Sequence, residues 1–140
     1  MTEIHRLADQ TETEGPADYF TGRATIRGLF ARDPSRVTGA IVTFRTRCSH
    51  RHGTLHPLGQ NPPDRASDGL GWTQVEDEPV QEFAAGDILL CPPDRPHWHG
   101  ASPDGPMTHA AIQEALDGTN VVWMHHVTDD EYLAGRHTAD

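Results

Sequence analysis

Two histidines separated by one residue, His97 and His99, follow an apolar run and a proline turn, and these residue types could carry chemistry. The stretch from Gly86 to Gly100 reads GDILLCPPDRPHWHG. Alternate residues of a strand share a face, so both imidazoles are predicted to point one way and Trp98 the other. Imidazoles bind divalent metals and transfer protons near neutral pH. Taken alone, the pattern is equally compatible with surface histidines in a polar loop.

Two further segments carry candidate ligands. His56 and Gln60 flank a Pro-Leu-Gly tripeptide, and His109 and Gln113 share one face of a strand predicted over residues 107–113. By residue type, His109 is more often a core histidine than a metal ligand, and an amide such as Gln113 is more often a hydrogen-bonding pocket residue. A barrel brings such groups together from the inward faces of facing strands.

The composition indicates an all-β fold. The chain has 140 residues, with 11 Pro and 13 Gly, and no long periodic helical segment. This combination is typical of many short strands joined by turns, as in a sandwich or barrel. Residues 1–18 are polar and acidic and are expected to form a flexible arm that orders only on a sheet edge or a partner subunit. Residues 19–140 are expected to form one domain.

Hydrophobic patterning predicts the elements that must position these residues. Strands are expected over residues 25–30, 39–44, 72–75, 80–83, 88–91, 107–113 and 121–127. In the second of these, Ala40 and Val42 share a face that we place inward. Thr128 followed by Glu131 is a capping box, which predicts a short C-terminal helix that Gly135 should end.

The net charge and the cysteine content limit the classes of binding partner and the cellular compartment that we expect. The net charge of −10 argues against a nucleic acid or an anionic membrane as partner and leaves a small-molecule ligand. The N-terminus lacks the apolar core of a signal peptide, and no run is long enough to span a bilayer. Cys48 and Cys91 could form at most one bridge. We therefore expect a cytoplasmic protein with reduced thiols.

The spacing of Gly86, Pro92, Asp94 and His97 resembles the second motif of the cupins, which are small metal-binding β-barrels; Asp94 stands at a position typical of glycine. The run His56-Pro57-Leu58-Gly59-Gln60 is similar to the end of their first motif, with glutamine where many cupins carry glutamate. The resemblance covers about residues 19–132. It is strongest to the compact bacterial cupins that include the manganese-dependent hydroxynitrile lyases.

The resemblance implies a cupin β-barrel, a double-stranded β-helix or jelly roll, with a short C-terminal helix. It implies a homodimer or higher homo-oligomer formed through edge strands or the N-terminal arm. It also implies a divalent metal, Mn(II) or Fe(II). The implied metal ligands are His56, Gln60 and His97; the implied catalytic residues are His99, His109 and Gln113; the implied substrate pocket is lined by Ala40, Val42 and Trp98.

Three classes of function then compete. The first is a metal-dependent lyase acting on a cyanohydrin or a similar hydroxylated small molecule. The second is an iron-dependent dioxygenase, which would need open coordination positions for oxygen. The third is a non-catalytic small-molecule-binding cupin with an impaired metal site. The lyase is favoured by the resemblance alone, because one fold hosts many chemistries.

Residues 46–68 depart from the family pattern. Thr54 stands where the first motif has another histidine, and each two-residue step toward His52 or His50 moves a side chain about 6 to 7 Å along a strand. Two prolines lie at 62 and 63, where the family has an apolar strand. We therefore expect weak metal binding and a loop where a barrel strand belongs.

An out-of-frame reading is one hypothesis for this departure. Codons compatible with residues 46–50, read one nucleotide later, permit Pro-Gly-Ala-Arg-Thr, which matches the family's run into its first motif. The same displacement across residues 61–66 permits Thr-Leu-Leu-Ile-Val, the missing apolar strand. Residues 46–68 therefore look frame-shifted, and resequencing the encoding DNA tests this hypothesis.

Overall fold

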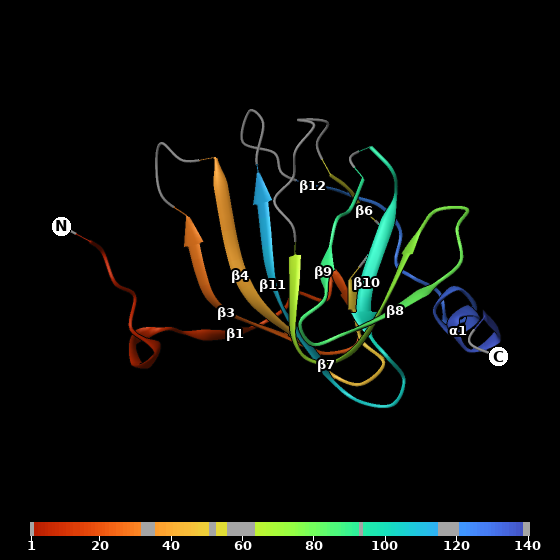
Figure 1. Cartoon of the computed structure of the whole chain (residues 1–140), viewed down its shortest axis with the longest axis horizontal. Coiled ribbons are helices and arrows are strands. Elements are labelled where there is room, and N and C mark those ends of the chain that lie inside the picture. The colour runs from red at the N-terminus through yellow and green to blue at the C-terminus, as the bar shows by residue number, and fades with distance from the viewer. Residues whose placement is uncertain are drawn as a thin grey trace.

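The computed structural model describes residues 2–31, 36–50, 53–55, 64–92, 94–114 and 121–138. Its strands curl around a shared interior, with the N-terminal arm projecting on one side and the C-terminal α-helix lying on the other (Figure 1). The elements are, in order, the 3-10 helix η1 (Leu7–Asp9), β1 (Glu12–Glu14), β2 (Phe20–Thr21), β3 (Ala24–Ala31), β4 (Val37–Phe44), β5 (Ser49–His50), β6 (Gly53–Leu55), β7 (Asp64–Val75), β8 (Gln81–Ala84), β9 (Ile88–Leu89), β10 (His97–Ala101), β11 (Met107–Glu114), β12 (Val121–Trp123) and α1 (Asp129–Thr138).

One antiparallel sheet runs in the order β1-β3-β4-β11-β7-β9. In its centre, His109 of β11 lies opposite Val42 of β4, and two residues further Ala111 lies opposite Ala40. At its edge, β1 pairs with β3, so part of the N-terminal arm lies along a sheet edge. A sheet edge is one of the two places where the sequence predicts that this arm becomes ordered. The predicted strands over 25–30, 39–44 and 107–113 are confirmed within one or two residues.

The second antiparallel sheet contains β2, β5, β10, β8 and the later half of β7. β6 pairs with β10 on one side and with β12 on the other. The strands predicted over 72–75 and 80–83 form an antiparallel hairpin, because Thr73 of β7 pairs with Gln81 of β8. β7 belongs to both sheets and bends at Gly69, whose φ is 77°. A Cβ there would lie 2.1 Å from the carbonyl oxygen of Pro106, so this bend requires glycine.

Two apolar clusters hold the sheets. The inner cluster lies between them and consists of Ala24, Val42, Phe44, Cys48, Ala66, Phe83, Ala101 and Met107. The outer cluster lies between the second sheet and α1 and consists of Trp72, Trp98, Val127 and Tyr132. The Tyr132 hydroxyl donates a hydrogen bond to the carbonyl of Ala101, which ties α1 to β10. Together these features give an all-β barrel with a short C-terminal helix, as expected.

The capping box at the start of α1 is confirmed in both directions. The Thr128 hydroxyl accepts from the amide of Glu131 at 3.2 Å, and the Glu131 carboxylate accepts from the amide of Thr128 at 3.0 Å. The expected end was wrong, because the helix continues past Gly135 to Thr138. A glycine inside a helix costs only about 1 kcal/mol relative to alanine, and this is too little to end a helix that packs against a sheet.

The expectation that residues 46–68 carry a loop in place of a barrel strand was also wrong for residues 64–68. Residues 64–68 belong to β7. Arg65, Ala66 and Asp68 pair with β11 on one side, and Asp64 and Arg65 pair with β9 on the other. Both prolines precede this strand, so every residue within it can donate to a ladder. Ala66 supplies a small apolar side chain to the inner cluster, while Ser67 and Asp68 are exposed. Residues 56–63 lie outside the described residues.

Within the described ranges, no helix is both long enough and apolar enough to cross a membrane.

Candidate functional site

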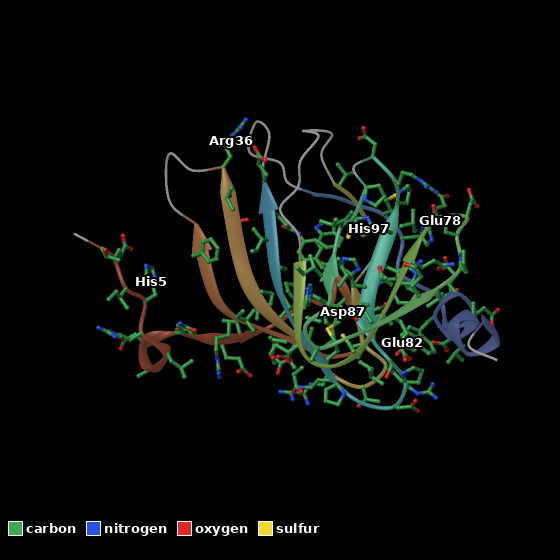
Figure 2. The ribbon with its side chains drawn as sticks, viewed as in Figure 1. His5, Arg36, Glu78, Glu82, Asp87 and His97 are labelled. Atoms are coloured by element: carbon green, nitrogen blue, oxygen red, sulfur yellow. The ribbon has the colours of Figure 1, made fainter. Side chains whose placement is uncertain are left out.

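His97 and His99 extend from the inner face of β10 and are both buried, with 4% and 3% of their surface exposed. Their ring centroids lie 5.2 Å apart, which confirms that the two imidazoles point the same way. Trp98 points to the opposite face and is fully buried in the outer cluster. Figure 2 shows His97 among the strands, away from His5 on the N-terminal arm. The structure therefore brings the histidine pair into the interior and does not bring Trp98 with it.

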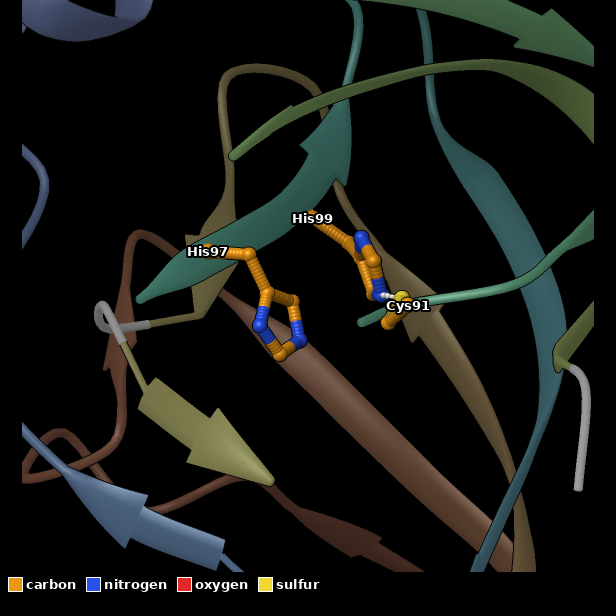
Figure 3. A group of neighbouring side chains, drawn as sticks. All are labelled: Cys91, His97 and His99. Atoms are coloured by element: carbon orange, nitrogen blue, oxygen red, sulfur yellow. Dashed lines mark hydrogen bonds between the residues drawn. The ribbon is translucent and has the colours of Figure 1, made fainter. Parts of the chain in front are cut away.

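Cys91 completes a cluster with these histidines, shown in Figure 3. Its Sγ lies 3.3 Å from Nε2 of His99. One potential ligand atom from each of Cys91, His97 and His99 lies within 4.8 Å of the other two. The three side chains therefore converge closely enough for one cation to contact all of them.

The turn before β10 fixes the tautomer of His97. Its Nδ1 lies 3.1 Å from the carbonyl oxygen of Arg95. A carbonyl oxygen only accepts, so Nδ1 carries the proton and neutral His97 keeps its lone pair on Nε2. The Arg95 guanidinium donates to the Glu78 carboxylate at 2.8 Å and to the carbonyl of Glu76 at 2.7 Å. These bonds hold in place the turn that carries the Arg95 carbonyl.

Thr73, which lies opposite His99 in the β7–β10 ladder, fixes the second tautomer. The Thr73 hydroxyl donates to the carbonyl of Trp98 at 3.0 Å and lies 2.8 Å from Nδ1 of His99. The hydroxyl has only one proton, so it accepts from Nδ1–H of His99. Neutral His99 therefore presents the lone pair of Nε2 to Cys91.

The imidazoles also alter the ionisation of Cys91. Burial by itself raises the pKa of this thiol, and it is the largest single influence. The charge on His99, the hydrogen bonds with His97 and His99 and the charge on His97 together outweigh burial and lower the pKa from 9.0 to about 6.

His109 faces this cluster from the other sheet. It is buried, its ring stacks on Phe44 at 5.3 Å, and its centroid lies 6.0 Å from that of His99 at an interplanar angle of 81°. Gln113 lies further along the same face of β11, opposite Thr38, and is half-buried. Ala40 and Val42 share this inner face. The structure thus places His109, Gln113, Ala40 and Val42 on one surface that faces His99.

His56 and Gln60, the other two expected metal ligands, lie outside the described residues. β6 ends at Leu55, immediately before them, and its Gly53 pairs with His97. Asp94, in the turn before His97, has a φ of 62°, so the glycine-like position expected for it is confirmed.

Sequence reasoning missed Cys91 and Thr73 as members of the cluster. Cys91 precedes a double proline, and its separation from His97 carries no periodic signal because a turn brings the thiol back to β10. Thr73 meets His99 only through the register of two strands that are distant in sequence. Both cysteines are free thiols, as expected.

An open groove of about 980 Å³ lies elsewhere, between the N-terminal arm and β3. Its lining includes Ile4, Pro16 and Phe30, and it contains none of the clustered histidines. We therefore place the candidate site at the histidine cluster.

The described donor atoms fit a divalent cation. His97 and His99 each direct Nε2 toward Cys91 and hold the Nδ1 proton in a hydrogen bond to an oxygen atom. This pattern is typical of metal-binding histidines, because the outer hydrogen bond fixes the ring orientation and the tautomer.

No protein-family model matches the chain. The chain is similar to an (R)-mandelonitrile lyase of Granulicella tundricola, with 49% identity over 131 residues that cover 93% of this chain and 98% of that protein. Among solved structures it resembles a cupin-like protein of Thermotoga maritima, with 25% identity, a TM-score of 0.79 and coverage of 88% and 92%. A cupin 2 conserved barrel domain protein of Rhodopseudomonas palustris shares the fold, with 15% identity, a TM-score of 0.64 and coverage of 87% and 79%.

Proposed function

Because the chain belongs to the cupin family, among the small bacterial cupins that include an (R)-mandelonitrile lyase, we propose that it is a metal-dependent lyase acting on cyanohydrins. The observation that carries this proposal is the 49% identity to that lyase over nearly the whole length of both proteins. The inner-face histidines give the proposal its chemistry, since fold alone does not imply function.

We assign the divalent cation, Mn(II) or Fe(II), to His97 together with His56 and Gln60. His97 is suited to this role because the Arg95 carbonyl holds its Nδ1 proton and leaves Nε2 as the donor atom. When bound, the cation supplies Lewis acidity that polarises the substrate oxygen.

His99 is the proposed proton carrier. In cyanohydrin cleavage, Nε2 of His99 accepts the hydroxyl proton while the bond to the nitrile carbon breaks, and the electron pair of that bond leaves with cyanide. The same proton then passes from Nε2 to cyanide, which gives hydrogen cyanide and the carbonyl product. Thr73 keeps Nε2 available throughout, because its hydroxyl holds the Nδ1 proton.

The opposite sheet supplies the remaining proposed contacts. His109, held against Phe44, is the second proton carrier and hydrogen-bonds the substrate from the side facing His99. Gln113 donates or accepts a hydrogen bond further along β11. Ala40 and Val42 line the apolar part of the pocket, where their short side chains leave room for a ring. Trp98 acts from the outer face, where it supports β10.

The lyase activity is testable by aldehyde release from mandelonitrile. We expect release from metal-loaded full-length protein, and a fall of about 100-fold or more in His99→Ala with the metal content unchanged. His97→Ala should lose both metal and activity, while the arm variant His5→Ala serves as the matched histidine control. No release after loading with either Mn(II) or Fe(II) would rule out the lyase, and oxygen uptake would favour the dioxygenase.

We also propose that the protein forms a homodimer or higher homo-oligomer through its N-terminal arm. Support comes from the apolar side chains that the arm exposes, since Ile4 and Leu7 are 59% and 70% accessible. Phe30 of β3 is also exposed and lines the neighbouring groove. Light scattering on the full chain should give at least twice the monomer mass, and removal of residues 2–11 should give the monomer.

A further inference from the structure

We propose that Cys91, His97 and His99 form a sulfur-containing cation site that takes a thiophilic metal such as Zn(II), with a ligand set that differs from that of the lyase cation. It shares only His97 with the set assigned above. Its binding is independent of the proposed function, whereas its effect on catalysis rests on that function.

Geometry is the first support. The three ligand atoms already lie within 4.8 Å of one another, and Sγ of Cys91 lies 3.3 Å from Nε2 of His99. Ligand atoms bound to one tetrahedral zinc ion at about 2.0 to 2.3 Å are separated by about 3.3 to 3.8 Å, so small side-chain movements suffice. The two histidines are buried, and Cys91 is half-buried.

Preorganisation is the second support. Nδ1 of His97 donates to the Arg95 carbonyl, and Nδ1 of His99 donates to Thr73, whose own proton goes to the Trp98 carbonyl. Both rings are thus held in the tautomer that places a lone pair on Nε2. Metal-binding histidines need this arrangement, and the protein's own hydrogen bonds supply it.

The donor set determines the kind of metal. Thiolate sulfur favours Zn(II), Co(II) and copper, whereas Mn(II) prefers oxygen-rich sites. Two imidazoles and one thiolate leave a fourth tetrahedral position open, as in zinc sites with three protein ligands. When the metal binds, the Cys91 S–H bond breaks, its proton passes to solvent, and a metal–sulfur bond forms.

Occupation of this site engages Nε2 of His99. The same lone pair cannot then accept the hydroxyl proton of a cyanohydrin, so a thiophilic metal should inhibit the lyase that we propose. The two classes of cation would therefore differ in their effect on the lyase. A hard cation bound by His97, His56 and Gln60 leaves Nε2 of His99 available to accept the substrate proton, whereas a thiophilic cation binds that nitrogen.

Cobalt binding to untagged, metal-free, full-length protein tests the site directly. Co(II) should produce the near-ultraviolet absorption of a sulfur-to-cobalt charge transfer, and added Zn(II) should remove it. Cys91→Ser should abolish this band and weaken Co(II) binding by at least about 10-fold, the effect that loss of even a supporting partner has on a metal site. Cys48→Ser, which changes the buried thiol outside this cluster, should keep the band.

A second measurement needs no variant. Zn(II) should protect Cys91 of the native protein from alkylation by iodoacetamide, as read by mass spectrometry of the peptide that contains it. Absence of both the cobalt band and the protection in the wild-type protein would overturn the proposal, as would an unchanged band in Cys91→Ser.

The experiment separates this proposal from the lyase. A cobalt–sulfur band together with no aldehyde release from Mn(II)-loaded or Fe(II)-loaded protein would support the site and contradict the lyase. Aldehyde release with no cobalt–sulfur band would support the lyase and overturn the site.

Discussion

Alternate residues of β10 face two different surroundings. On the inner face, His97 and His99 lie beside Cys91 and hold hydrogen bonds through both imidazoles. On the outer face, Trp98 lies in the apolar cluster under α1, where its ring centroid is 5.7 Å from that of Tyr132 and the two rings are tilted by 42°. The same short strand thus carries polar groups suited to chemistry on one side and a large apolar anchor on the other.

The difference shows how the site is kept in place. Buried imidazoles contribute little apolar burial, and their bonds to Thr73 and the Arg95 carbonyl orient the rings. The strand is held from behind by Trp98 and by the bond between Tyr132 and the Ala101 carbonyl. We therefore expect outer-face substitutions to change stability first and inner-face substitutions to change binding and proton transfer first.

Trp98→Ala should have the largest effect. Loss of a fully buried tryptophan lowers the free energy of unfolding by about 3 to 5 kcal/mol. Urea denaturation followed by circular dichroism measures this, with the partly buried Trp123→Ala as the matched control that should lose less. An unchanged denaturation midpoint in Trp98→Ala would break the comparison.

High pH should destabilise the protein through ionisation of Cys48. This residue lies beside β10, where its carbonyl accepts a hydrogen bond from the amide of Ala101. Burial raises the pKa of this thiol to about 12 from 9.0, while a backbone hydrogen bond from Arg45 opposes it. Between pH 9 and pH 12 the Cys48 thiol keeps its proton in the folded state and loses it in the unfolded state. The stability that the protonated thiol contributes is therefore complete below pH 9 and is lost as the pH rises toward 12.

Relative to Cys48→Ala, the wild-type protein should therefore lose about 2 to 3 kcal/mol between pH 8 and pH 11. Denaturation curves of both proteins across this range give the difference. Parallel losses in the two proteins would show that Cys48 ionises as it does in the unfolded chain.

Tyr132→Phe removes only the hydroxyl that donates to the Ala101 carbonyl. We expect a loss of about 1 to 2 kcal/mol in the free energy of unfolding, because a buried acceptor loses its partner. Cobalt binding at Cys91 should stay within about twofold of the wild type, since the inner face is untouched. A large loss of cobalt affinity would show that the two faces are coupled more tightly than proposed.

Thr73→Val should have the smallest effect on stability, about 1 kcal/mol, since the threonine is half-buried and the shape is nearly kept. Its effect should fall on the tautomer of His99, whose Nδ1 proton loses its acceptor. Nitrogen-15 NMR of the imidazoles should show a mixture of tautomers in Thr73→Val and the wild-type signature in Thr73→Ser. An unchanged spectrum in Thr73→Val would remove Thr73 as a positioning residue.

Much of this arrangement could be predicted from local patterns. The alternation around Trp98 predicted that His97 and His99 share a face, and the Thr128 and Glu131 pair predicted the start of α1. These features depend on residues close in sequence, where strand periodicity and capping chemistry act directly. Likewise, the positions of Ala40 and Val42 on the inner face follow from alternation along one strand.

The parts that could not be predicted depend on contacts between distant segments. Cys91 reaches His99 because a turn reverses the chain, and Thr73 reaches it through a strand register that no local pattern encodes. The length of α1 depends on packing against Trp72 and Trp98, which outweighs the local effect of Gly135. Asp64 to Asp68 form a strand because two neighbouring strands supply hydrogen bonds, although the local sequence is polar.

The bend of β7 at Gly69 has a consequence for the order of folding. Its later half pairs with β8 through residues close in the chain, such as Thr73 with Gln81, whereas its earlier half pairs with β11 through distant residues, such as Gly69 with Met107. Closing a short loop loses less entropy, so the β7–β8 hairpin should form early and fix the position of Thr73. The partner that orients His99 would then be in place before β11 brings His109 to the other side.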